Sequence, residues 1–94
     1  MRTSTPHHLA LYYFDSCPYC QRVLVLLPKW KTHVELRDIL AHENYAQELI
    51  DQGGIDQVPC LRITLENGAV QWLYESLDII DYLEGLEEQA RVSA

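Results

Sequence analysis

Two cysteines separated by two residues are the groups in this sequence best suited to chemistry. Cys17 and Cys20 enclose Pro18 and Tyr19 in the segment CPYC, which follows the apolar run LALYYF after Asp15 and Ser16. Such a pair can form a redox centre, half of a metal site or a short structural disulfide. With Cys60 the chain has three cysteines, which is a small and odd number for the disulfide framework of a secreted protein. We therefore interpret the pair as redox-active or metal-binding.

A structural disulfide and a metal site both suit this pair less well. In the chain-entropy model so short a loop gains ~2 kcal/mol from a disulfide, against ~3 kcal/mol for a loop of roughly fifteen residues. Zinc usually takes four ligands, commonly from two pairs. The histidines have no spacing that completes such a set, and we expect them to face solvent: they are His7, His8, His33 and His42. No metal site is predicted.

Local structure has to make one of the two thiols reactive. The nucleophile in disulfide exchange is the thiolate, and a free cysteine is only about 3% ionised at pH 7. Because Pro18 suits a first helical turn, Cys17 is expected at a helix N-terminus, where unpaired amides favour negative charge. The helix dipole stabilises a thiolate there by only about 0.3–1 kcal/mol, so hydrogen bonds from backbone amides such as that of Cys20 must add to it. The negative charge of Asp15 opposes ionisation of Cys17, and the positive charge of Arg22 favours it. We expect Cys17 to be the exposed nucleophile and Cys20 the deeper, resolving thiol.

The pair lies within an alternation of strands and helices. The run VLVLL after it also fits a strand, but Pro18 at its start and Pro28 near its end favour a helix, capped by Asp15 or Ser16. Asn67-Gly68 between two apolar runs predicts a hairpin. In chain order we expect strand 9–14, helix 18–30 with an irregular last turn, strand 33–39, helix 44–54, strands 60–65 and 69–74, and a last helix with Ser76 as its N-cap.

This element order predicts an α/β fold. A βαβ–α–ββ–α chain gives a four-stranded mixed sheet with about three helices distributed over both faces. Apolar residues make up 48% and charged residues 22% of the chain, an ordinary globular balance. We expect one domain over residues 1–94, with its core at about 9–88 and flexible ends.

Three sequence blocks carry a resemblance to a known family: CPYCQR (17–22), VPCLRI (58–63) and YESLDIIDYL (74–83). A CxxC after the first strand of a βαβ unit is typical of thioredoxin-like proteins. With Pro-Tyr between the cysteines, the chain resembles the dithiol glutaredoxins, close to the N-terminal domain of glutathione transferases. The resemblance covers about residues 9–86 and implies the thioredoxin-like (glutaredoxin) fold. The all-helical domain of the transferases does not follow, so a complete transferase is not expected.

The resemblance also implies a glutathione site. Val58-Pro59 resembles the family's cis-proline, and the backbone of Val58 would pair with the cysteine of glutathione. Glu75-Ser76 resembles the element before the last helix that holds the γ-glutamyl carboxylate through helix amides. Simple helix capping explains Ser76 as well, and we expect capping in either case.

Other residues have two interpretations each. Tyr19 is expected to lie exposed over the site and to pack on substrate. Asp78 either partners the helix dipole or meets the amino group of the ligand. Cys60 is either a buried strand residue or a third thiol open to glutathionylation. The remaining large aromatic residues are expected to pack in the core: Tyr12, Tyr13, Trp30 and Trp72.

One position departs from the family pattern. Glutaredoxins often carry a lysine three residues before the first cysteine, where it helps to hold the glycine carboxylate of glutathione, and this chain has Phe14 there. Recognition of that carboxylate must use another group or be weaker. Arg22, Arg62 and Gln57 are the candidate replacements.

Charge and hydropathy restrict the partners. The net charge is −7, with seven scattered Lys and Arg residues, so nucleic acid and anionic membranes are not expected as partners. The N-terminus has no apolar stretch after its charge, and no run approaches ~18 apolar residues. We expect a cytoplasmic, monomeric protein.

The leading hypothesis is a glutathione-dependent thiol-disulfide oxidoreductase. It would reduce protein–glutathione mixed disulfides and protein disulfides through Cys17 and Cys20, with glutathione as co-substrate and no metal. One alternative is a thioredoxin-like reductant dedicated to a single partner protein. Another is a non-catalytic module that binds glutathione or an iron–sulfur cluster.

Overall fold

The computed structural model describes residues 6–93, with side chains for residues 6–89. The expected flexible ends include residues 1–5 and 94, which lie outside the described part. The order of elements confirms the predicted βαβ–α–ββ–α chain. In sequence they are β1 (Pro6–Tyr13), α1 (Pro18–Leu24), the 3₁₀ turn η1 (Leu27–Lys29), β2 (Glu35–Asp38), α2 (Glu43–Glu48), the π-helical turn η2 (Leu49–Gly53), β3 (Cys60–Leu65), β4 (Val70–Leu73) and α3 (Ser76–Ser93).

The four strands form one mixed sheet in the order β2-β1-β3-β4. β1 pairs in parallel with β2 and antiparallel with β3, and β3 pairs antiparallel with β4. The β3–β4 hairpin turns at the predicted position, where Gly68 has a φ of 91° and the side-chain oxygen of Asn67 accepts from the amide of Ala69 at 2.9 Å. The positive φ explains the glycine in this turn. The predicted thioredoxin-like α/β fold is thus confirmed.

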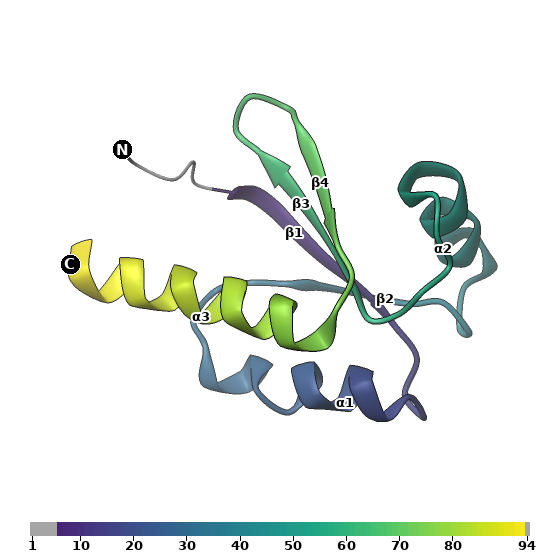
Figure 1. Ribbon diagram of the computed structural model, residues 1–94, viewed down its shortest axis with the longest axis horizontal. Helices are drawn as coiled ribbons and strands as arrows, with labels where there is room; N and C mark the ends of the chain where they lie inside the picture. Colours follow the sequence, from purple (N-terminus) through teal and green to yellow (C-terminus); the bar gives the residue numbers. More distant parts are fainter. Residues whose placement is uncertain (1–5, 94) are drawn as a thin grey trace.

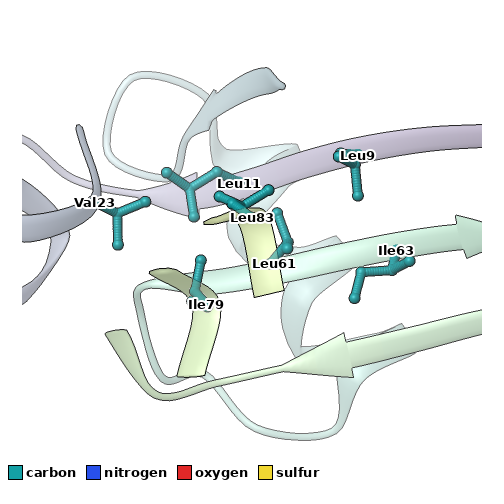
Figure 2. Packing of buried hydrophobic residues seen from close by; sticks show 7 residues of the cluster. All are labelled: Leu9, Leu11, Val23, Leu61, Ile63, Ile79 and Leu83. Atoms are coloured by element: carbon teal, nitrogen blue, oxygen red, sulfur yellow. The ribbon is translucent and has the colours of Figure 1, made fainter. Parts of the chain in front are cut away.

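Helices cover both faces of the sheet, as expected. α1 and α3 lie together on one side, whereas α2 lies on the other (Figure 1). The larger core fills the first side, between the sheet and the two helices (Figure 2). Its buried members are Leu9, Leu11, Val23, Leu61, Ile63, Ile79 and Leu83. A smaller core beneath α2 and η2 consists of Tyr12, Leu49 and Cys60.

Three helix boundaries differ from the prediction. The helix starting at Pro18 ends at Leu24, and the irregular continuation is the separate turn η1. Cys17 caps α1, so the expected cap at Asp15 or Ser16 is wrong. At the last helix, the carbonyl of Glu75 accepts the first helical bond, from the Ile79 amide at 2.9 Å. Ser76 therefore lies inside the first turn of α3 and is not its N-cap.

None of the helices within residues 6–93 combines the length and the apolar character needed to cross a membrane.

Candidate functional site

The turn between β1 and α1 places the first cysteine at the cap of the helix. The amide of Cys17 donates to the carbonyl of Phe14 at 3.2 Å, which reverses the chain after the strand. Cys17 then has extended backbone angles (φ −80°, ψ 118°), and Pro18 begins the helix. The amide of Cys20 donates to Sγ of Cys17 at 3.4 Å. The sulfur thus takes the place of the side-chain oxygen that usually caps a helix, and it receives the amide hydrogen bond that was expected to favour its thiolate.

This capping geometry buries both cysteines. Cys17 is only 6% exposed, so the expectation of an exposed nucleophile is wrong, because the side chain lies against the first turn of its own helix. Cys20 is fully buried. Burial raises the pKa of the Cys20 thiol to about 12; the Phe14 backbone lowers this pKa and the hydrogen bond with Cys17 raises it further. At neutral pH Cys20 is therefore a protonated thiol.

A pocket of about 380 Å³ gathers three segments that are distant in sequence. Tyr19 comes from the start of α1, three residues from the loop before β3, and three from the β4–α3 connection. The full lining is Tyr19, Gln57, Val58, Pro59, Tyr74, Glu75 and Ser76. All five residues predicted to bind glutathione are among them. The volume lies in the usual range for small-molecule sites.

The loop before β3 presents an unpaired stretch of backbone to this pocket. The Val58-Pro59 peptide bond is cis, as the family resemblance implies. Within residues 6–93, the amide and carbonyl of Val58 have no backbone hydrogen-bond partner. They are available to an extended ligand.

Side chains at the other end of the pocket hold one another in place. Nε2 of Gln57 donates to a carboxylate oxygen of Glu75 at 3.2 Å. The hydroxyl of Tyr74 donates to the carbonyl of Gly53 at 2.7 Å, which connects the pocket wall to η2. Ser76 is buried at the beginning of α3. Sequence reasoning missed Tyr74, although it directly precedes the Glu75-Ser76 pair.

The other candidates lie outside this lining. The guanidinium of Arg22 lies 5.1 Å from the centre of the Tyr19 ring, a cation–π contact along α1. Asp78 is exposed in the first turn of α3, as a dipole partner would be. Arg62 lies over the Trp72 ring at 5.7 Å, on the face covered by α2.

Cys60 is a buried strand residue. It is fully inaccessible, and burial raises the pKa of its thiol to about 12, although the Leu73 backbone and the Tyr74 side chain lower it. Its side chain belongs to the small core with Tyr12 and Leu49. The first of the two interpretations given to this residue therefore holds in the structure.

A polar network beneath α2 escaped the sequence reasoning. The Tyr12 hydroxyl donates to Glu48 at 2.5 Å, and Arg37 donates to both of these side chains, at 2.8 and 2.7 Å. Arg37 also pairs with Glu35, which in turn meets Nε2 of His8 at 2.9 Å. His8 is thus paired, whereas the other three histidines are exposed, as expected. Among the side chains described, no group of three or more His, Cys, Asp or Glu could hold a metal ion.

Comparison with known families agrees with this architecture. The profile of the family described as Glutathione S-transferase, N-terminal domain, matches residues 11–91. The chain belongs to this family. The expected kinship with the thioredoxin-like N-terminal domain of the transferases is thereby confirmed.

Solved structures of glutathione transferase-like proteins have the same fold. Maleylacetoacetate isomerase from Anaeromyxobacter dehalogenans 2CP-1, with bound GSH in its active site, matches with 26% identity and a TM-score of 0.63 over 86% of this chain. A second structure of that isomerase, with dicarboxyethyl glutathione and citrate in the active site, matches with 28% identity and a TM-score of 0.62, again over 86% of this chain. The chain spans 38% and 37% of the length of these two isomerase chains.

A glutaredoxin is also among the structural matches. The solution structure of glutaredoxin from Brucella melitensis has 19% identity and a TM-score of 0.49, with coverage of 94% of this chain and 86% of that one. Among curated protein sequences, none matches this chain.

Proposed function

We propose that this protein is a glutathione-dependent thiol-disulfide oxidoreductase acting through Cys17 and Cys20. The observation that carries the proposal is the pocket formed by Tyr19, the cis Val58-Pro59 bond and the start of α3. Cys17 is not part of this lining, but it caps the helix that carries Tyr19, and its sulfur accepts an amide hydrogen bond. Membership of the glutathione transferase N-terminal family supports glutathione as the ligand. The related isomerase, which binds GSH in its active site, supports it further.

The ligand would use backbone groups at both ends of the pocket. The free amide and carbonyl of Val58 pair with the cysteine backbone of glutathione, as in strand addition. The amides at the start of α3 receive the γ-glutamyl carboxylate, because α3 is a long helix that begins at Ser76, a residue of the pocket lining. Tyr19, which is 56% exposed, covers the bound peptide.

The reaction is a pair of thiol-disulfide exchanges. The Cys17 thiolate attacks the glutathione sulfur of a protein–glutathione mixed disulfide, and a new Cys17–glutathione disulfide forms. The old S–S bond breaks, and the protein leaves as a thiolate that takes up a proton. A second glutathione thiolate then attacks this intermediate, which releases oxidised glutathione and restores the Cys17 thiolate.

Cys20 offers a second way to resolve the intermediate. It attacks Cys17, releases glutathione and forms the Cys17–Cys20 disulfide, which permits reduction of protein disulfides. The pKa of about 12 makes Cys20 a weak nucleophile at neutral pH while Cys17 is reduced. We therefore propose that external glutathione resolves most turnovers.

The proposed partners follow from this chemistry. They are glutathione and proteins with glutathionylated or disulfide-bonded cysteines, met by a single-domain monomer in the cytoplasm. No resident metal takes part in the proposed reaction.

The decisive experiment measures glutathione-coupled reduction of a small mixed disulfide by wild type and two variants. Cys17→Ser is expected to lower kcat/KM by at least about 1000-fold, because the other two thiols, of Cys20 and Cys60, are fully buried. Cys20→Ser should retain activity within about threefold of wild type. Circular dichroism of both variants controls for folding.

Other results would replace the proposal with a different function. A folded wild type that ignores glutathione but reduces one protein disulfide would be a dedicated reductant. Absorbance near 400 nm after anaerobic purification, without turnover, would indicate a cluster-binding module.

A further inference from the structure

The ligand pocket has a distinctive charge. Of the seven residues that line it, only Glu75 carries a formal charge, and this charge is negative. The carboxylate is exposed and accepts a hydrogen bond from Gln57 at 3.2 Å, which fixes its position at the pocket wall. Asp78, one turn along α3, adds a second negative charge nearby.

None of the described cationic side chains lines this pocket. Arg37 is held between Glu35 and Glu48 beneath α2. Arg62 bonds to the hydroxyl of Thr64 at 3.1 Å and covers the Trp72 ring on the same face. The lysines at positions 29 and 31 come after the end of α1. Arg22 alone approaches the pocket, and its guanidinium lies against the Tyr19 ring.

The distribution of charge around the pocket affects the two ends of a bound glutathione molecule differently. The γ-glutamyl end has both an ammonium group, which the Glu75 carboxylate attracts, and a carboxylate, which the α3 amides receive. The glycine end has only a carboxylate. None of the lining residues offers that carboxylate a positive side chain, and the one formal charge among them, on Glu75, is negative.

We propose that the pocket prefers γ-glutamyl-cysteinyl thiols whose C-terminal end is uncharged over those that end in a carboxylate. Esters, amides and amine conjugates of glutathione are the corresponding chemical class. This inference rests on the proposed function, because it assumes that the glutathionyl group binds in this pocket. Repulsion of one charge by another near a protein surface predicts a preference of about threefold at low ionic strength.

The test compares two mixed disulfides that differ only in this charge. One joins 2-mercaptoethanol to glutathione, and the other joins it to the glycine monoethyl ester of glutathione. Single-turnover rates are measured with reduced Cys20→Ser protein, so that Cys17 attacks the glutathionyl sulfur and 2-mercaptoethanol leaves. The ester is expected to react about threefold faster, and salt should reduce this advantage by screening the repulsion.

Two matched variants locate the effect. Glu75→Gln keeps the shape of the side chain and removes its charge, so the ester-to-acid ratio should fall toward 1. Glu84→Gln, on the exposed surface of α3 away from the pocket, should keep the wild-type ratio. Because both substrates are measured on the same protein, a loss of folding or of general affinity cancels in the ratio.

The outcomes separate this inference from the function on which it rests. A ratio at or below 1 in the unmodified pocket overturns the preference while leaving the oxidoreductase intact. An Arg22→Gln variant that slows the free acid alone overturns the stated cause, because Arg22 would then be the carboxylate's cationic partner. If neither mixed disulfide reacts, the proposed function itself fails, and the preference fails with it.

Discussion

Cys17 and Cys20 show how one helical turn can give two identical side chains different chemistry. The Cys17 sulfur lies at the N-terminal end of α1, where it accepts a hydrogen bond from the Cys20 amide. The Cys20 sulfur lies inside the first turn, fully buried, with a pKa raised to about 12 by burial and by its hydrogen bond with Cys17. In the proposed reaction this difference makes Cys17 the attacking group, while the buried Cys20 stays protonated at neutral pH.

The third thiol gives a prediction for alkaline pH. Burial raises the pKa of Cys60 from 9.0 to about 12, so between these values the unfolded chain loses a proton that the folded protein keeps. The free energy of unfolding should therefore fall as pH rises through this window, by at most ~1.36 kcal/mol per pH unit for one such group. Urea unfolding of wild type and Cys60→Ala at several pH values, under reducing conditions, tests this.

The variant is expected to be less stable at pH 7, because it leaves a small cavity, yet to lose less stability between about pH 9 and 12. Tyr12 and Cys20 keep their own contributions in both proteins, so the difference in slope reports Cys60 together with the part of the raised Tyr74 pKa that Cys60 causes. Equal slopes would contradict the assignment of the proton to this thiol.

For individual residues, the sequence predicted the contacts between residues that are close together along the chain or that match a family motif. The five pocket residues were predicted in this way, and so was the hydrogen bond from the Cys20 amide to the Cys17 sulfur. The Tyr12–Arg37–Glu48 network does not, because its members are 25 and 36 positions away from Tyr12 and meet only once α2 has folded onto the sheet. The burial of Cys17 was missed because it depends on which residue caps the helix.

Among the elements, η2 is the one most constrained by its neighbours. Its last residue, Gly53, faces the wall of the pocket: a Cβ at this position would lie 2.8 Å from the Tyr74 hydroxyl and 3.1 Å from the Trp72 ring. Both atoms belong to aromatic side chains, and the Tyr74 hydroxyl is also held by its hydrogen bond to the Gly53 carbonyl. The turn can therefore pack against β4 only without a side chain.

Gly53→Ala should destabilise the protein by about 1–3 kcal/mol and raise KM for the glutathionyl substrate, because Tyr74 has to move. Gly85→Ala is the control: it lies in α3 with open space around its Cβ position, and it should gain about 0.5–1 kcal/mol from helix propensity. Thermal unfolding and steady-state kinetics of the two variants measure both effects. Equal behaviour of the pair would show that the close approach at Gly53 carries no cost.

Local signals decided which elements could be predicted. The hairpin turn was found because Asn-Gly specifies it within two residues. Helix ends were less well predicted, because Cys17 and Glu75 take cap positions that the usual preferences give to Asp15, Ser16 or Ser76. The π-helical turn at Leu49–Gly53 has no sequence signature, since it arises from packing against β4.

Across the whole molecule, the sheet separates two cores of unequal size. Seven buried residues lie between the sheet and α1 and α3, whereas three lie beneath α2 and η2. The sequence predicted helices on both faces from the order of elements and from the family resemblance. It could not predict this inequality, because the alternation along β1 and β3 gives each face of the sheet apolar residues without showing how many of them a helix will cover.

The small core beneath α2 has a consequence for motion. A layer held by three buried residues and one ion-pair network should undergo local unfolding more often than the layer formed by α1 and α3. Backbone amides of α2 and η2 should therefore exchange with deuterated water faster than those of the central turns of α3. Val58 packs against this core and also lines the pocket, so a bound glutathionyl ligand should slow exchange in α2, at a distance from any atom it touches.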